Sequence, residues 1–539
     1  MHAKIHTIAF RGIETIAVTV QIHIANGLPA IAIVGLADKA VAESRERVRA
    51  ALASIGLALP PKRITANLAP ADVLKEGAHF DLPIALGLMV AMGVVPRDAV
   101  EDALVLGELA LDGAIQPVSG VLPAAIAAVA AGRDLICPHD CGSEAAWADG
   151  LSIIAPPSLT SLVNHIHGRQ FLHPPTPKMA PARQNMPDLA DLKGQDTARR
   201  VLEIAAAGGH HFLMVGPPGA GKSMLAARLS GLLPHLNPAE ALEVTMLHSV
   251  AGNSTEGGLI QNRPFREPHH SASMAALVGG GLRAKSGEIS SANHGVIFLD
   301  ELAEFSRVVL DSLRQPLETG SVVVARANHH VTYPARFQLV AAMNPCRCGY
   351  LGDPARACSR APDCGQNYQA KISGPMMDRF DLIIEVPEIS AGTLLKEASG
   401  ESSQIVATRV ATARQFGARR NQGVMRANAQ IGIDQLDQQI IMDDAAQDLL
   451  RTAMDQANLS ARAYHKIMRV SRTIADLAGD DRVGRAALAE ALAYRAMPLL
   501  AWVGCLRSIA SHVSAAISMP DKRWISRMPV GEVTLISVI

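Results

Sequence analysis

The sequence lacks an excess of charge of either sign. Its 539 residues include 50 Lys and Arg and 50 Asp and Glu, so the formal net charge is zero. Because proteins that bind nucleic acids usually carry a surplus of basic residues, the whole-chain charge argues against that class. The sum conceals unlike parts, since residues 1–170 hold 12 basic and 16 acidic residues and the remainder holds 38 and 34. Neutrality therefore does not exclude a DNA partner contacted through local basic segments.

Long hydrophobic runs are also missing. The longest, residues 82–95, covers 14 residues and includes one Pro and two Gly, whereas a helix that spans a bilayer needs about 20 apolar residues. The first ten residues mix His and Lys with isolated apolar residues, and a secretory signal would place a continuous apolar stretch before its cleavage site. We therefore expect a cytoplasmic location and no membrane partner.

The composition is not that of a disordered chain, because 49% of the residues are hydrophobic and 19% are charged. The length predicts two to four domains. Five Pro within residues 171–187 predict an extended linker. After Pro387, strand-like segments give way to helical patterns rich in Ala, Leu and Arg. The predicted parts are a domain at 1–170, a core at 188–388, a helical domain at 389–497 and an atypical tail of unassigned role at 498–539.

Strand-like and helical segments alternate in the first domain and in the core, which predicts a multidomain α/β protein. In the core, the alternation is typical of a parallel nucleotide-binding sheet. The expected strands of the first domain are 16–24, 30–34 and 63–68, and its expected helices are 37–54, 82–92 and 122–131. The expected core strands are 212–215, 296–299 and 337–342, and the helical domain should contain helices at 443–456 and 460–477.

A phosphate-binding loop is predicted after the first core strand. The pattern G-x-x-x-x-G-K-[ST] is filled by Gly216, Pro217, Pro218, Gly219, Ala220, Gly221, Lys222 and Ser223. In such a loop the glycines let backbone N–H groups surround phosphate oxygens, Lys222 neutralises phosphate charge, and Ser223 ligates Mg²⁺. The position between an apolar strand and a helix argues against a mere glycine turn.

Polar side chains follow the next two core strands. The strand at 296–299 ends in Asp300, predicted to hold Mg²⁺, and Glu301, predicted to deprotonate the attacking water. The structural alternative is that Asp300 and Glu301 only cap the N-terminus of a helix. Asn344 follows the third strand and is predicted to sense the γ-phosphate, although Asn-Pro is also an ordinary turn signal.

These residues together resemble an AAA+ ATPase, with Walker A at 216–223, Walker B at 296–301 and sensor 1 at Asn344. The segments REPHHSAS (266–273), AAMNPCRCGY (341–350) and SGPMMDRFDL (373–382) are similar to the magnesium-chelatase-like AAA+ ATPases of the YifB/ComM type. The resemblance covers about residues 16–497. It implies ATP and Mg²⁺ as cofactors, a homo-oligomeric ring, usually hexameric, and a DNA helicase that drives branch migration in natural transformation or recombination.

The same resemblance assigns roles to two arginines. Arg379, within GPMMDRFD, matches the arginine finger that reaches a neighbouring subunit's site, where a guanidinium stabilises the transferring phosphoryl group. The alternative is an ion pair within the chain, with Asp378 or Asp381. Arg462 matches sensor 2 on a helical lid, and the alternative for it is a DNA or surface contact.

Four of the seven cysteines are close together in the sequence. Cys346, Cys348, Cys358 and Cys364 give C-x-C-x9-C-x5-C in a polar segment, and four thiolates around one Zn²⁺ would hold it together. This spacing differs from the common double C-x2-C, so free thiols or a disulfide remain the alternative.

Candidate DNA contacts fall into two groups. Acid-free arginine segments at 402–433 and 462–472 suit phosphate contacts, although a solvated face or a subunit interface is an equal alternative. Two insertions are stronger candidates for lining a ring pore. They are residues 264–281 and a predicted hairpin at 320–334, with Arg326, Asn328, His329 and His330 near its tip.

The first domain resembles the Lon-protease-like domain of this family. The Lon nucleophile and base motifs would fall at 81–85 and 119–122, where Ile84 and Leu122 stand in place of Ser and Lys. Because a hydrocarbon side chain cannot attack a carbonyl or accept a proton, we expect no proteolysis by this pair. The alternative to a DNA motor is a chelatase-like, ATP-driven remodelling chaperone of a protein partner, which would use the same AAA+ motifs.

Overall fold

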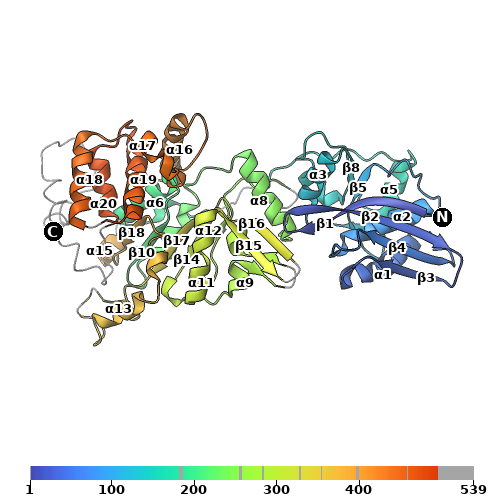
Figure 1. Cartoon of the computed structure of the whole chain (residues 1–539), viewed down its shortest axis with the longest axis horizontal. Helices are drawn as coiled ribbons and strands as arrows, with labels where there is room; N and C mark the ends of the chain where they lie inside the picture. The colour runs from blue at the N-terminus through green and yellow to red at the C-terminus, as the bar shows by residue number, and fades with distance from the viewer. Residues whose placement is uncertain are drawn as a thin grey trace.

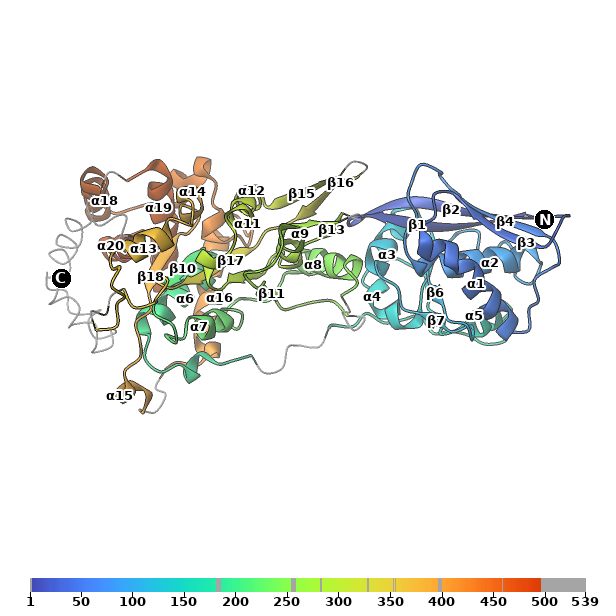
Figure 2. The same ribbon diagram turned by 90° about the horizontal axis from the view of Figure 1, so that it is seen from below.

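A computed structural model describes residues 2–180, 186–253, 258–281, 284–326, 329–351, 353, 355–395, 400–457 and 459–495. An α/β domain forms one end of the molecule, and a second α/β region with a group of helices forms the other (Figures 1 and 2). The predicted tail at 498–539 lies outside the described residues. Within the described ranges, no helix is both long and apolar enough to cross a membrane.

The N-terminal domain is built on a seven-stranded sheet in the order β3-β4-β2-β1-β5-β8-β9. Its longest strands, β1 (His2–Arg11) and β2 (Glu14–Ala25), pair antiparallel. In β2 the buried Val18, Val20 and Ile22 alternate with more exposed residues, as in a half-buried strand. The other strands are β3 (Ala30–Val34), β4 (Arg63–Ala69), β5 (Ala103–Val105), β8 (Asp134–Ile136) and β9 (Ile153–Ile154), and β6 (Glu108–Leu109) and β7 (Ile115–Gln116) form a separate ribbon.

Helices pack against this sheet within two residues of the predicted positions. They are α1 (Lys39–Ser54), α2 (Asp81–Ala91), α3 (Val121–Ala130), α4 (Gly142–Ala145) and α5 (Leu159–Ile166), where α4 and α5 are additional. Residues 81–89 of helix α2 are all buried, and apart from Asp81 their side chains are apolar on every face of the helix. Its one carboxylate, Asp81, is paired by Arg47 at 2.6 and 3.0 Å, as a buried charge requires.

A five-stranded parallel sheet forms the core, in the order β11-β14-β17-β10-β18. Residues of the central strands are buried on both faces, so these strands are nearly continuous apolar runs in the sequence. Because the strands are parallel, their carboxyl ends meet at one edge. The bounds are β11 (Phe265–Arg266), β14 (Val296–Leu299), β17 (Gln338–Met343), β10 (Phe212–Val215) and β18 (Leu382–Glu385).

Helices cover both faces of the core sheet. Phe212 and Met214 of β10 share one hydrophobic core with α6 (Asp196–Gly208), α7 (Lys222–Leu229) and the C-terminal helices, whereas Leu213 belongs to the core on the opposite face. The C-terminal helices are α16 (Ser403–Arg420), α17 (Leu436–Gln439), α18 (Asp444–Ala457), α19 (Ala461–Ala478) and α20 (Arg485–Ala493). The remaining helices are α8 (Pro238–Val250), α9 (Met274–Leu277), α10 (Glu288–Ser291), α11 (Arg307–Ser312), α12 (Arg314–Thr319), α13 (Asp363–Gln369), α14 (Gly374–Met377) and α15 (Ala391–Leu394).

Two β-hairpins extend from the core. The predicted hairpin at 320–334 is present as β15 (Ser321–Arg326) paired antiparallel with β16 (His329–Pro334). A shorter one, β12 (Gly279–Gly280) with β13 (Lys285–Ser286), lies within and just after the other predicted insertion. In Figure 2 the longer hairpin points toward the N-terminal domain.

The N-terminal domain contacts the core through α8 and the longer hairpin. The backbone N–H of Gly120 donates to the carbonyl and hydroxyl oxygens of Ser249, at 3.2 and 3.0 Å. Gly12, in the β1–β2 turn, has φ +65°, and a Cβ there would lie 2.3 Å from Val331 of β16. Only glycine permits this approach, because another side chain would clash with the hairpin.

Candidate nucleotide site and its surroundings

The predicted phosphate loop, acids and Asn344 meet at the carboxyl edge of the parallel sheet. Strand β17 lies between β14 and β10 and is hydrogen-bonded to both, and each of the three ends just before one of these segments. In open α/β sheets this edge is where ligands bind. The structure therefore brings together residues that are distant in the sequence, 77 positions apart for Ser223 and Asp300 and 122 for Lys222 and Asn344.

The loop after β10 has the geometry of an anion cradle. Gly219 and Gly221 have φ of +78° and +87°, and a Cβ at Gly216 would lie 2.1 Å from the carbonyl oxygen of Val386. Helix α7 begins at Lys222, so its free N–H groups face the loop. The Lys222 ammonium contacts the carbonyl oxygens of Gly216 and Pro217 at 2.7 and 2.8 Å. Burial lowers the pKa of Lys222, while Asp300 and Glu301 act in the opposite direction.

Two oxygen donors suited to Mg²⁺ lie next to the loop. The hydroxyl of Ser223, in the first turn of α7, donates to Oδ2 of Asp300 at 2.6 Å. Hydroxyl and carboxylate oxygens are ligands of hard divalent cations, and Mg²⁺ commonly takes one or two protein ligands with phosphate oxygens completing the shell. The pair therefore fits the predicted magnesium site.

Glu301 and Asn344 complete this edge. Glu301 adopts φ +52°, and its backbone N–H donates to Oδ1 of Asp300 at 2.8 Å. Its side chain is half exposed and lies 3.3 Å from His270. Oδ1 of Asn344 accepts from the Lys222 ammonium at 3.1 Å, so this side chain lies where a γ-phosphate contact is predicted.

Arg379 and Arg462 lie near each other but away from the carboxyl edge of the sheet where the phosphate loop lies. Asp381, two residues after Arg379, donates its backbone N–H to His211 just before β10 begins, so Arg379 is at the amino edge of the sheet. Both guanidinium groups contact the Glu318 carboxylate of α12: Arg379 directly, and Arg462 at 3.7 Å. The structure therefore does not bring these arginines to the nucleotide site of their own chain.

Arg379 does form an ion pair within the chain, but its partner is Glu318 and not the predicted Asp378 or Asp381. Asp378 is paired with Arg495 at 3.7 Å, and Asp381 with Lys466 of α19 at 2.9 Å. Lys466, followed by His210 and His211, holds the pKa of the mostly buried Asp381 well below its usual range although burial opposes this. Arg379 lies in the turn before Asp381, and Arg462 lies on α19 with Lys466. The Lys466–Asp381 ion pair therefore holds this turn against α19. No local sequence pattern identifies Glu318, because its partners come from distant segments.

Most basic side chains of the two acid-free segments bond to other groups of the same chain and do not form a free basic stripe. Side chains from both segments bond to groups in the C-terminal helices or in α6. Arg414 donates to the carbonyl of Ala206, and Arg420 pairs with Asp476. Arg472, fully buried, also contacts Asp476, at 3.0 Å. Arg409 bonds Glu203 and Glu401, Arg426 bonds Gln435, and Arg469 bonds the carbonyl of Ile431.

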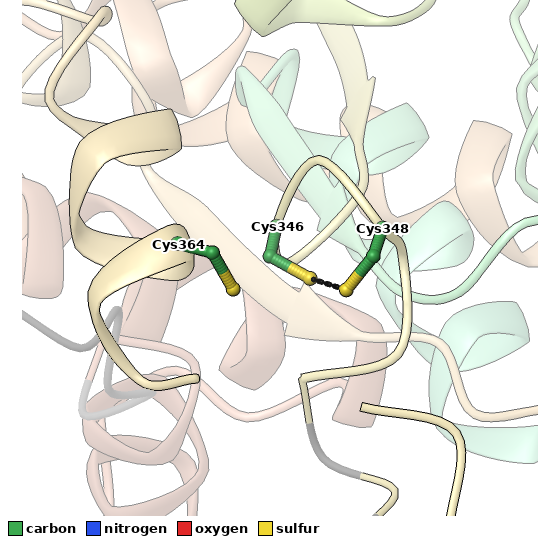
Figure 3. A group of neighbouring side chains, drawn as sticks. All are labelled: Cys346, Cys348 and Cys364. Atoms are coloured by element: carbon green, nitrogen blue, oxygen red, sulfur yellow. Dashed lines mark hydrogen bonds between the residues drawn. The ribbon is translucent and has the colours of Figure 1, made fainter. Parts of the chain in front are cut away.

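Three of the four clustered cysteines meet directly after β17. The sulfur atoms of Cys346, Cys348 and Cys364 all lie within 4.8 Å of one another, and Figure 3 shows their side chains pointing to one place. Cys358 is outside this group but within hydrogen-bond reach of Cys348 and Cys364. Hydrogen bonds, first from Cys346 and then from backbone N–H groups, lower the pKa of Cys348 to about 6. A tetrahedral Zn²⁺ separates its sulfur ligands by about 3.8 Å, so this donor set fits zinc.

The positions that would carry Lon-type proteolysis lie in the hydrophobic core. Ile84 of α2 is 1% exposed, and Leu122 of α3 is 0% exposed. Both chemistry and burial therefore exclude this pair from catalysis.

Comparisons with known proteins cover nearly the whole chain. Residues 20–141 match the family model for subunit ChlI of Mg-chelatase, residues 188–394 that for magnesium chelatase subunit ChlI, and residues 400–495 that for its C-terminal part. The chain is 43% identical over 502 residues to competence protein ComM of Haemophilus influenzae, covering 92% of this chain and 97% of the relative. It is 41% identical over 497 residues to YifB of Escherichia coli, with the same coverage. A magnesium-chelatase 67 kDa subunit of Chlorobaculum parvum is 27% identical over 157 residues, 29% of this chain and 23% of that protein.

Proposed function

The chain belongs to the ComM/YifB family of magnesium-chelatase-like AAA+ proteins, and we propose from this premise that it is an ATP-driven ring motor that acts on DNA. The main support for this proposal is that the predicted ATPase residues lie at two different edges of one sheet. Lys222, Ser223, Asp300, Glu301 and Asn344 occupy one edge, whereas the arginines predicted to stabilise the transition state occupy another.

At the first edge, the proposed chemistry is hydrolysis of ATP. The loop amides and Lys222 would bind the phosphates, and Ser223 and Asp300 would hold Mg²⁺, which neutralises charge on the phosphate oxygens when bound. Glu301 would accept a proton from water, and Asn344 would orient the γ-phosphate. Helix capping, the alternative role of Asp300 and Glu301, does not explain why Asp300 bonds Ser223.

A complete site requires a second copy of the chain. Because Arg379 and Arg462 are together but away from their own phosphate loop, we propose that both act on ATP bound by the neighbouring subunit. Nε of Arg379 is buried and has no hydrogen-bond partner among the described residues, so its guanidinium has donor capacity to spare. Repetition of this heterologous contact closes a ring, for which we propose six subunits.

DNA is the proposed substrate, contacted through the two hairpins in the ring pore. The relative from H. influenzae is named a competence protein, which supports a role in DNA uptake or integration. The hairpins β12–β13 and β15–β16 pack together, because a Cβ at Gly279 would meet Val324 at 3.1 Å. Most basic side chains of the acid-free segments 402–433 and 462–472 bond within the chain, so the hairpins are the remaining candidates for DNA contact. The proposed reaction is branch migration.

The N-terminal domain is proposed to be a Lon-like module that has lost proteolysis and serves interaction or DNA handling. The C-terminal helices are proposed to act as the lid of the ATPase. They share one hydrophobic core with α6 and α7, the helices on either side of the phosphate loop, which supports this role.

The function is tested with purified protein, ATP, Mg²⁺ and a labelled four-strand DNA junction. We expect the junction to raise the rate of ATP hydrolysis and to be converted to products, and we expect DNA binding to weaken steeply as salt is raised, because phosphate contacts release counterions. The Lys222→Ala variant is the control and should convert no junction. If the junction is not processed but ATP is hydrolysed, remodelling of a protein partner becomes the better explanation of this ATPase.

We also propose that the cysteine group holds a structural Zn²⁺ beside Asn344. We expect about one zinc per purified chain by elemental analysis, because the three converging cysteines together with Cys358 would supply the four ligands of a closed tetrahedral site. Cys364→Ser should lose most of this zinc and lower the melting temperature, since metal binding contributes directly to folding. Cys141→Ala, a buried thiol in the N-terminal domain, is the control and should keep it. A zinc content near zero in the unaltered protein would rule the site out.

A further inference from the structure

Half of one face of the N-terminal sheet is left open. On one side of strands β1, β2 and β4, the apolar side chains pack in a core with α1 and α2. On the other side, Ile8 of β1 and Leu104 of β5 share a core with α3, which covers the part of the sheet next to β5. Further along β1, and on β2, β4 and β3, the side chains of this second side are exposed or half-buried. In Figure 2 these strands lie along the outer side of the domain.

The register of the strands determines which side chains share this open face. Lys4 lies opposite Gln21, Gln21 opposite Asn67, and Asn67 opposite Val34, so one residue from each strand forms a row across the sheet. Neighbouring rows lie two positions away along each strand. The open face is made by these outward residues of the four strands, and its ionisable and long polar members include His2, Lys4, His6, Gln21, His23 and Arg63. With ordinary strand spacings it is about 15 Å wide and about 20 Å long.

The open face carries cations without acids. None of its outward residues is acidic, although residues 1–170 hold 16 acidic residues. Lys4 and Arg63 are exposed and have no ion-pair partner among the described residues. The exposed basic side chains elsewhere in residues 2–133 are mostly paired with carboxylates, namely those of Arg11, Lys39, Arg45, Arg49, Arg97 and Arg133. A face that is merely solvated would not collect the unpaired cations of an acidic domain.

Imidazole rings and amides accompany the two cations. His2 and His23 lie opposite each other on β1 and β2, and His6 lies two residues beyond Lys4. Burial, followed by the charges of Arg133 and Lys4, lowers the pKa of His6, although Asp102 and Glu101 beyond the border of the face oppose this. A neutral imidazole is a flat ring on which a nucleobase stacks. The Asn67 amide donates to Gln21 at 3.0 Å, which leaves further donors and acceptors of both groups to a ligand.

The same two strands connect this face to the hairpin β15–β16. The β1–β2 turn packs on that hairpin, since a Cβ at Gly12 would lie 2.3 Å from Val331. From Gly12, β1 leads back to Lys4 over about 25 to 30 Å. Figure 2 shows β1 and β2 running away from the hairpin along the domain. A flexible strand that leaves the hairpin therefore meets the open face next.

We propose that the open face binds single-stranded DNA that leaves the hairpins. The choice of ligand rests on the proposed DNA function, whereas the acid-free geometry does not. Lys4 and Arg63 contact phosphates, His2 and His23 stack on bases, and Gln21 bonds to base edges. A positively charged surface with stacking rings suits single strands, because the bases of a duplex are already stacked on one another. Every base has a stacking face, so we expect little preference for sequence.

The face is tested by the binding of a fluorescent thymidine strand of about 20 nucleotides to the full chain without ATP. We expect Lys4→Ala combined with Arg63→Ala to weaken binding about 10-fold and to lower the salt dependence by about 1.4, as loss of two phosphate contacts would. The matched control is Arg45→Ala combined with Arg49→Ala. It removes the same charge from α1, on the covered side of the sheet, and should change neither quantity.

Stacking is tested separately at His23. We expect His23→Ala to weaken binding at least about fivefold, whereas His23→Phe, which keeps a flat ring, should bind as the unaltered protein does. The basal rate of ATP hydrolysis should be the same in all of these variants, which shows that they are folded. A photoreactive amino acid in place of Gln21 should crosslink to the strand, and one in place of Glu46 on α1 should not.

The outcomes separate this site from the proposed motor. If the crosslink forms and the affinities fall as expected but the DNA junction is not processed, the motor fails and the site stands. If the junction is processed while the Lys4 and Arg63 variant binds DNA as tightly as its control, the site is overturned. It is also overturned if that variant changes only the size of the assembly at equal concentration, because the face would then join two copies of the chain.

Discussion

Glu301→Gln is expected to lower the rate of ATP hydrolysis by at least about 100-fold, because an amide cannot accept the proton of the attacking water. This corresponds to about 2.7 kcal/mol of activation free energy. ATP binding should be retained, since the phosphate loop and the Ser223–Asp300 pair are unchanged. The measurement is steady-state phosphate release, together with equilibrium binding of ATP.

The matched control is Glu304→Gln. Glu304 lies three residues further along and pairs with Lys371 at 3.4 Å, away from the phosphate loop. Its replacement should change the rate by less than about twofold, because exposed ion pairs contribute little. Hydrolysis that persists in Glu301→Gln would remove this residue from the role of base.

Arg379→Ala is expected to reduce hydrolysis by about 10³-fold, the lower end of the range for an arginine finger. In the isolated chain this guanidinium contacts Glu318 and not its own nucleotide site. The loss should therefore depend on assembly, and dilution below the assembly concentration should remove the difference between Arg379→Ala and the unaltered protein. Arg307→Ala, an exposed arginine on α11, is the control and should remain active.

Mixing two inactive variants distinguishes action on the neighbour from action within the chain. An Arg379→Ala subunit keeps its base, and a Glu301→Gln subunit keeps its arginine. One complete site forms wherever an Arg379→Ala subunit is followed by a Glu301→Gln subunit in the ring. In an equal random mixture this holds at about one boundary in four, so up to about a quarter of the normal rate should return. No recovery in rings that contain both variants would show that Arg379 does not act across the subunit boundary.

Much of the nucleotide site is predictable from the sequence because each part is local. The loop 216–223 is continuous, and Asp300, Glu301 and Asn344 each follow an apolar strand directly. Parallel strands align their carboxyl ends, so these parts meet without further information. The strand β1 could also have been found, because Ala3 and Ile5 are buried alternately with exposed residues.

Long-range polar partners could not be predicted in the same way. Arg420 and Arg472 look like free cations in an acid-free segment, yet both contact the buried Asp476. Charge counts within a window do not show which face of a helix is covered by its neighbours. The same holds for Glu318, which becomes significant through Arg379 and Arg462.

The sequence by itself determined the family, the alternation of strands and helices, and the identity of the residues around a bound phosphate. It did so because loop chemistry and the periodicity of burial are properties of neighbouring residues. Only the tertiary structure decided that the basic segments are mostly internal, that three cysteines converge, that two arginines share one carboxylate away from their own nucleotide site, and that His270 reaches Glu301. These contacts join elements far apart in the chain, and the packing of helices on two faces of a sheet selects them.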